Sequence, residues 1–166
     1  MDVERRSATP AEARALAHPL RVRILRLCLD AALTNRDLAA RLDQDPATVL
    51  HHVRTLVRTG FLAAEPERRG RRGAREIPYR STGKSWTLDV GRGNDGVAAI
   101  HDAVRAELLD AGPDALLTAT RLAVRLSPEQ LAEIGERLKA LIEDAHAWDA
   151  EGGEPIALYL VAHRRP

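Results

Sequence analysis

A row of polar side chains follows one side of residues 46–59, which the helical periodicity of the sequence predicts to be a helix. The other side carries four apolar residues that would face a core: Val49, Val53, Leu56 and Val57. Hydroxyl, imidazole and guanidinium groups can form hydrogen bonds with the edges of nucleic-acid bases, and a guanidinium also binds phosphate. An ordinary solvated helix face is the alternative interpretation. The polar side consists of Ala47, His51, Arg54, Thr55 and Arg58, with Thr48 at its flank.

A second group of cations follows this helix along the chain. Such a cluster attracts phosphates, and the glycines within it allow the backbone to follow a groove. A loop that only keeps the protein soluble is the alternative, but the position directly after a helix with a polar face favours a basic arm. We call residues 66–75 the wing, and its arginines are Arg68, Arg69, Arg71, Arg72 and Arg75.

Four short helices are predicted within residues 9–59, where N-cap residues, first-turn prolines and a capping box mark their starts. A proline separates the first two helices, because the residue before proline disfavours helical backbone. Only two residues lie between the third helix and the cap of the fourth, so a tight turn must join them. These signals are Thr9-Pro10, His18-Pro19, the capping box at residues 34–37, and Asp45-Pro46.

Short extended segments replace the helical pattern after Gly60. Residues 61–64 are apolar and residues 77–82 are extended in character, so they predict a β-hairpin with the wing at its tip. Residues 86–94 are interpreted as a linker. A helix over about residues 96–111 follows, with apolar side chains at helical spacing: Val97, Ile100, Val104 and Leu108.

The last third of the chain predicts a β-α-β arrangement. Strands are expected at residues 118–126 and 155–164, with a capped helix that begins at Pro128 between them. The predicted fold class is α+β and mainly α. An N-terminal winged helix-turn-helix domain occupies residues 9–85, and a smaller helical or β-α-β domain occupies residues 94–166. One face of the capped helix carries an apolar seam, expected in a dimer interface or core: Leu131, Ile134, Leu138, Leu141, Ala145 and Trp148.

Charge is divided unevenly over the 166 residues. Residues 1–90 carry an excess of six positive charges and residues 91–166 an excess of five negative charges, so only the first part is expected to meet a polyanion. Cys28 is the only cysteine, which excludes an internal disulfide. The longest apolar run, residues 156–162, is shorter than the ~18 residues of a membrane span. Residues 1–12 lack the apolar segment of a secretory signal, so a cytoplasmic protein without membrane contact is expected.

About residues 13–80 resemble the ArsR-type winged helix-turn-helix repressors of bacteria. The resemblance rests on the segments ALAHPLRVRILRLC, TNRDLAARL and DPATVLHHVRTLVRTGFL. It implies a homodimer that inserts residues 46–52 into the DNA major groove and uses the hairpin as a wing. By position it adds Leu50 to Thr48 and His51 as a DNA contact, and it implies that His52 packs inside the domain. The C-terminal extension is similar to that of a subgroup of these regulators common in high-GC bacteria.

The resemblance and the residue patterns together predict one DNA-binding surface. It combines the start of the third helix, the polar side of the fourth helix and the wing. The predicted DNA-binding residues are Thr34, Arg36, Ala47, Thr48, Leu50, His51, Arg54, Thr55, Arg68, Arg69, Arg71, Arg72 and Arg75.

Metal binding and catalysis have no support in the sequence. The metal-sensing relatives need paired cysteines before the recognition helix, and this chain has none there. Cys28 is interpreted as a small core residue. Another site of the family uses Asp and His on a C-terminal helix, for which the weak candidates are Glu143, Asp144, His146, Asp149 and His163. No metal, cofactor or catalytic residue is therefore predicted, and the protein is not expected to be an enzyme.

The predicted function is a homodimeric transcription regulator that binds double-stranded DNA at an inverted repeat. Repression is the default for the family that the chain resembles. The alternative function is a sensor whose C-terminal domain binds a small organic effector and controls DNA release. A third interpretation is that the C-terminal half serves only as a dimerisation scaffold. An apolar pocket between the capped helix and a sheet would distinguish these two interpretations.

Overall fold

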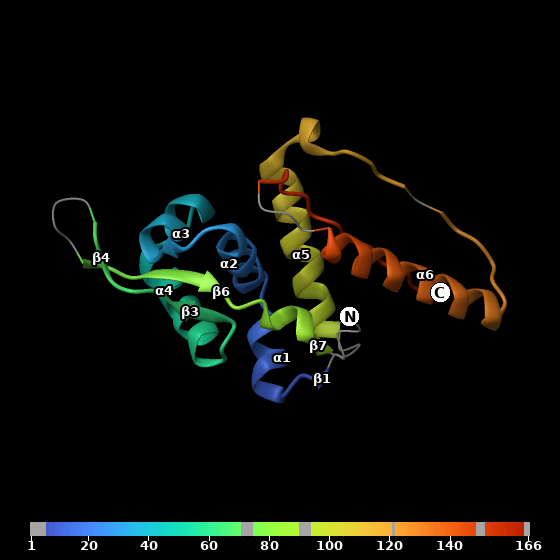
Figure 1. Cartoon of the computed structure of the whole chain (residues 1–166), viewed down its shortest axis with the longest axis horizontal. Helices are drawn as coiled ribbons and strands as arrows, with labels where there is room; N and C mark the ends of the chain where they lie inside the picture. Colours follow the sequence, from blue (N-terminus) through green and yellow to red (C-terminus); the bar gives the residue numbers. More distant parts are fainter. Residues whose placement is uncertain (1–5, 71–74, 90–93, 121, 149–151, 165–166) are drawn as a thin grey trace. The chain divides into compact units, whose positions relative to one another are not determined.

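The structure is a computed structural model that describes residues 6–70, 75–89, 94–120, 122–148 and 152–164 (Figure 1). The chain divides into two compact units, Met1–Ala115 and Leu116–Pro166. The mainly helical fold class with a small sheet is confirmed. Among the described residues, no helix is both long enough and apolar enough to cross a membrane.

The first unit contains the four short helices that the capping signals predict. Thr9 and Thr34 each form a complete capping box, with Glu12 and Asp37 respectively. Both boxes satisfy backbone N–H groups that the first helical turn leaves without partners. The Nδ1 atom of His18 accepts from the backbone N–H of Leu20 at 3.2 Å and so caps the second helix. The helices are α1 (Pro10–Leu16), α2 (Pro19–Asp30), α3 (Asn35–Leu42) and α4 (Pro46–Arg58).

A three-stranded sheet with the order β2-β6-β3 lies beside these helices. The hairpin is present, because β3 (Leu62–Ala64) pairs antiparallel with β6 (Pro78–Ser81). Its tip continues as a second antiparallel pair, β4 (Arg68–Arg69) with β5 (Arg75–Glu76), and projects away from the helices (Figure 1). The sequence analysis missed β2 (Leu33–Thr34), because two residues are too few for a periodicity to show.

Residues 86–94 are not simply a linker. A 3₁₀ helix, η2 (Lys84–Thr87), leads into β7 (Leu88–Asp89), which pairs in parallel with β1 (Arg6–Ser7). Leu88 is buried in the core. The pairing depends on a partner about 80 residues away along the chain, so local composition could not predict it. Residues 90–93 lie outside the described residues.

The core of the first unit is built from the apolar faces of α1 to α4 and from the base of the hairpin. Phe61, Ile24 and Leu38 are among its largest fully buried side chains. Cys28 is also fully buried, and burial raises the pKa of its thiol to about 11, which agrees with an inert core residue. Val57 differs from its prediction, since it is 37% exposed at the side of α4.

Helix α5 (Asn94–Ala111) belongs to the first unit, whereas the sequence analysis assigned it to the C-terminal domain. Its buried face consists of small residues, Ala99 and Ala103, which allow a close approach to another helix. Two ion pairs attach it to α2. Arg26 Nε lies 2.8 Å from Glu107 Oε2, and Arg23 pairs with Asp110. The predicted apolar stripe lies on another side of α5, where Val97 and Leu108 are exposed.

The second unit contains the capped helix α6 (Pro128–Ala147), which begins with a capping box between Ser127 and Gln130. The two predicted strands at 118–126 and 155–164 are wrong, since no described residue of either segment is in a strand. An alternating pattern favours a strand only where a partner supplies its hydrogen bonds. The described residues of this unit form no such pairing, and Arg121 lies outside them.

The apolar seam of α6 is largely open to solvent. Leu131, Ile134, Leu141 and Trp148 are exposed, Trp148 by 73%, while Leu138 and Ala145 are half-buried. No residue of this helix is fully buried. The seam is therefore present on one face, as its spacing predicts, but the described residues of its own unit do not cover it.

Candidate nucleic-acid interface

Helix α4 presents its N-terminal side chains to solvent. Asp45 caps it, because its Oδ1 atom accepts from the backbone N–H groups of Ala47 at 2.9 Å and Thr48 at 3.1 Å. Ala47, Thr48, His51 and Arg54 are exposed. The residues predicted from helical periodicity therefore share an accessible surface. Thr55 and Leu50, by contrast, are half-buried, and the Thr55 hydroxyl donates to the His51 carbonyl at 3.1 Å.

The inner side of α4 contains a buried imidazole. His52 is 7% exposed, and its ring lies 4.4 Å from the ring of His18, centroid to centroid. Arg21 approaches the Nδ1 atom of His52 at 3.4 Å. The pKa of His52 is lowered to about 4, mainly by burial and in the same direction by the nearby positive groups. His52 is therefore neutral at pH 7 and supports α4 from within, as the resemblance implied.

The two predicted contacts at the start of α3 differ in exposure. Arg36 is exposed. Thr34 is buried, and its hydroxyl donates to Asp37 Oδ2 at 2.8 Å while it accepts from the Asp37 backbone N–H. These hydrogen bonds hold the pKa of Asp37 below its usual value. The Thr34 side chain serves the helix start, so we do not include it among the proposed DNA contacts.

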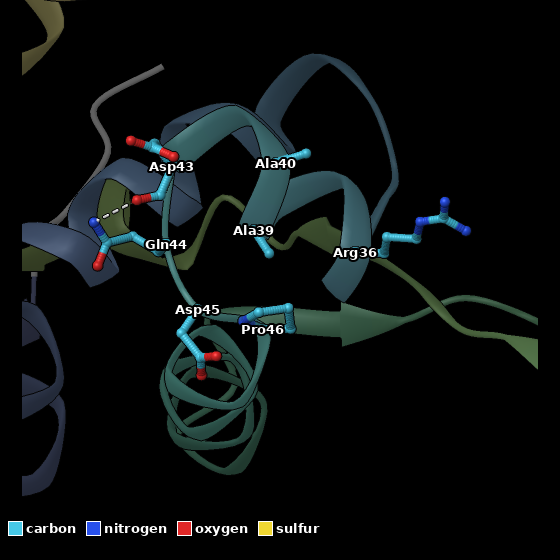
Figure 2. A pocket seen from close by; sticks show the side chains of 7 residues that line it. All are labelled: Arg36, Ala39, Ala40, Asp43, Gln44, Asp45 and Pro46. Carbon is cyan, nitrogen blue, oxygen red and sulfur yellow. Dashed lines mark hydrogen bonds between the residues drawn. The ribbon is translucent and has the colours of Figure 1, made fainter.

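A shallow groove of about 450 Å³ lies over the turn between α3 and α4 (Figure 2). Asp43 adopts a left-handed backbone conformation there with φ 49°, and Gln44 donates to its carbonyl at 2.9 Å. Two carboxylates, Asp43 and Asp45, line the groove, while the Arg36 side chain extends away from them. This acidic turn does not favour phosphate, so α4 and the wing are the better candidates for an anion-binding surface.

The wing arginines have acidic neighbours within the chain. Arg68 lies 3.8 Å from Asp37, and Arg75 lies 3.2 Å from Glu67. Arg69 and Arg75 are exposed, whereas Arg71 and Arg72 lie outside the described residues. A phosphate would have to compete with these carboxylates, so the number of arginines overstates the positive charge of the wing.

A second groove, of about 280 Å³, separates α4 from the hairpin. Arg54 and Arg58 lie on its helix side, and Ile77 and Tyr79 lie on its hairpin side. Arg58 is exposed, as expected from its predicted place on the polar side of this helix, but it was not among the predicted DNA contacts. Its spacing of one helical turn from Arg54 is the signal that favours including it. The groove places two guanidinium groups between the two elements that are candidates for DNA contact.

No three His, Cys, Asp or Glu side chains come close enough to hold a metal ion in the part of the chain that the structure describes. His146 and Glu143 lie on α6, and Asp149 falls outside the described residues. The absence of a metal requirement stays a prediction.

Comparison with protein families identifies this arrangement of helices. The family model described as a helix-turn-helix domain matches residues 16–64, from the end of α1 to β3. Residues 16–64 form a helix-turn-helix domain. Within this helix-turn-helix domain, α3 and α4 are the two helices joined by the tight turn. Helix α4 is the second of them, which is the position of the recognition helix in DNA-binding helix-turn-helix proteins.

Similarity to solved structures is low. HlyU from Vibrio cholerae is 23% identical and covers 46% of this chain and 75% of its own, with a TM-score of 0.39. The adhesin competence repressor AdcR from Streptococcus pyogenes is 19% identical. The match covers 76% of this chain and 80% of AdcR, with a TM-score of 0.36. A mutant of ZitR from Lactococcus lactis is 18% identical. The match covers 76% of this chain and 73% of ZitR, with a TM-score of 0.36. No curated protein matches this chain.

Proposed function

We propose that this protein binds double-stranded DNA sequence-specifically and regulates transcription as a homodimer, with repression as its default action. One observation carries the proposal. The recognition helix of the helix-turn-helix domain exposes Thr48, His51 and Arg54 on one side, next to a basic hairpin. In helix-turn-helix proteins the N-terminal residues of this helix contact base edges in the major groove.

Different side chains would have different roles in the complex. Thr48 and His51, near the start of α4, would form hydrogen bonds with base edges. Arg54 and Arg58, further along α4, reach guanine or phosphate, and the exposed wing arginine Arg69 would bind phosphate. Base contacts provide sequence discrimination, while phosphate contacts provide affinity that decreases with salt.

The homodimer is supported by apolar surface that each unit leaves uncovered by its own described residues. Val97 and Leu108 are exposed on α5, and the seam of α6 is exposed in the second unit. A two-fold interface would bury the same patch on both subunits. It would also place two recognition helices about 34–36 Å apart, which requires an inverted repeat in the DNA. An effector-binding role for the second unit stays an alternative prediction.

The test is to recover bound fragments from a library of genomic DNA and to measure affinities for the recovered operator and for random DNA. Thr48→Ala and His51→Ala are expected to reduce the ratio of operator to random affinity by about 5- to 150-fold, since a good base contact contributes ~1–3 kcal/mol of discrimination. Arg137→Ala, in an exposed i,i+4 pair of α6, is the control that leaves the ratio unchanged. A wild-type ratio in both helix variants would show that α4 does not read the bases.

A further inference from the structure

Lys84 follows the hairpin in the sequence, and its ammonium group reaches back to the junction where α4 ends and the hairpin begins. Its Nζ atom donates to the carbonyl of Thr59, the C-cap residue of α4, at 2.7 Å. The same ammonium lies 2.7 Å from Glu12 Oε1 on α1 and 5.2 Å from the centre of the Phe61 ring. One cation therefore connects α1, the end of α4 and the first residue of the hairpin segment.

Glu12 is a fixed anion rather than a mobile surface charge. It is 6% exposed, and its two oxygens accept from Arg6 at 2.6 and 2.9 Å. One of them also accepts from the backbone N–H of Thr9 at 2.8 Å. These hydrogen bonds, with the one from Lys84, hold the pKa of the carboxyl well below its usual value. A buried carboxylate held in this way fixes the position of the ammonium relative to α1.

The backbone at the junction is shaped to accept this ammonium. Gly60 has φ +75°, and a Cβ atom at this position would lie 3.3 Å from Lys84 Nζ. The Thr82 hydroxyl donates to the Gly60 carbonyl at 2.8 Å, and the Thr82 N–H donates to the Phe61 carbonyl at 3.1 Å. Both strands of the hairpin are thus anchored at the point where Lys84 holds the helix end.

The residue type fits the position. The sequence contains 25 Lys and Arg residues, of which only Lys84 and Lys139 are lysine. A compact ammonium with three donors can be shared between a carboxylate and a carbonyl, whereas a planar guanidinium favours bidentate pairing. A lysine therefore suits the contacts made at this position better than an arginine would.

We propose that Lys84 is a positioning residue for DNA recognition, because it fixes the orientation of α4 relative to α1 through Glu12. This inference rests on the proposed function. Helix α4 has 13 residues and is ~20 Å long, so a tilt of ~5° at its C-terminal end moves the base-reading end by ~2 Å. A displacement of this size is enough to break a base contact whose hydrogen-bond distance must remain near 3 Å.

The test compares Lys84→Met, Glu12→Gln and the double variant with the wild type. The quantity measured is the ratio of operator affinity to random-DNA affinity. Partial unfolding reduces both affinities by the same factor, so a purely stabilising role cannot change this ratio. We expect each single variant to reduce the ratio about tenfold, equivalent to the loss of one base contact. The double variant is expected to be no worse than the poorer single variant, since both residues belong to one bridge.

Lys139→Met, the same substitution in an exposed pair on α6, is the matched control and is expected to keep the wild-type ratio. Lys84→Gln, which can still donate to the Thr59 carbonyl, replaces Lys84→Met if that variant does not fold. A folded Lys84 variant with the wild-type ratio would overturn this inference alone. A wild-type protein that does not distinguish operator from random DNA would overturn the proposed function together with it.

Discussion

Acidification is expected to destabilise the recognition helix through His52. This imidazole is buried beside the Arg21 guanidinium and the His18 ring. Arg21 cannot move away easily, because it also donates to the carbonyls of Ala15 at 2.5 Å and Arg14 at 2.6 Å. A proton on His52 would therefore place a second positive charge next to a fixed one, in a site with little access to water.

The magnitude follows from the two pKa values of His52. The unfolded chain binds the proton with a pKa near 6.5, and the folded protein with a pKa of about 4. Between these values the unfolded state binds more protons, so the free energy of unfolding decreases as the pH falls. Linkage gives a loss of ~2 kcal/mol between pH 7 and pH 5, and of ~3 kcal/mol below pH 4. The pKa of His18 is lowered as well, which adds to the effect in the same direction.

The assay is urea unfolding of the wild type and of His52→Gln at a series of pH values from 7 to 4. The variant is expected to lose ~2 kcal/mol less than the wild type between pH 7 and pH 5, because it has no imidazole to protonate at this position. His51→Gln, which changes the exposed neighbouring histidine, is the control and should retain the pH dependence of the wild type. Equal losses in the wild type and in His52→Gln would refute the reasoning.

Three further predictions concern the wing, the seam and metal ions. Replacing Arg69 and Arg75 with alanine should weaken operator and random binding alike and reduce the salt slope by about one unit per lost phosphate contact, in titrations with increasing salt. Leu141→Asp, at an exposed seam position, should lower the dimer fraction in sedimentation while helicity is retained, and an unchanged dimer would exclude the seam from the interface. DNA affinity should be the same with a chelator and with added zinc, nickel or copper, and a tenfold loss would contradict the absence of metal sensing.

Local sequence determined where the helices begin and which side of α4 is polar. Thr9, Thr34, Asp45 and Ser127 each satisfy N–H groups within three residues of themselves, so their effect does not depend on the rest of the fold. The positions of Val49 and His51 on opposite sides of α4 follow from helical geometry alone. The polar side of α4 could be predicted from the sequence because it depends only on helical geometry.

Burial and strand pairing depended on partners that local patterns do not identify. The periodicity of α5 marked Val97 and Leu108 as its apolar stripe, but α5 packs through Ala99 and Ala103 because small side chains permit close helix contact. The alternating segments around α6 form no strands in their described residues, since an alternating pattern cannot supply its own hydrogen-bonding partner.

The contacts of Lys84 with Glu12 and Thr59 also depend on partners that the local sequence does not identify. Glu12 completes the capping box of Thr9, and Lys84 is one of two lysines, but neither feature indicates that the two side chains meet. They meet because β1 pairs with β7 and because Gly60, which follows the C-cap of α4, leaves room for an ammonium group. The sequence determined the recognition helix and its polar side by local hydrogen bonding and helical period. Only the tertiary structure decided how that helix is held, since the contacts that hold it join residues 25 and 72 positions apart.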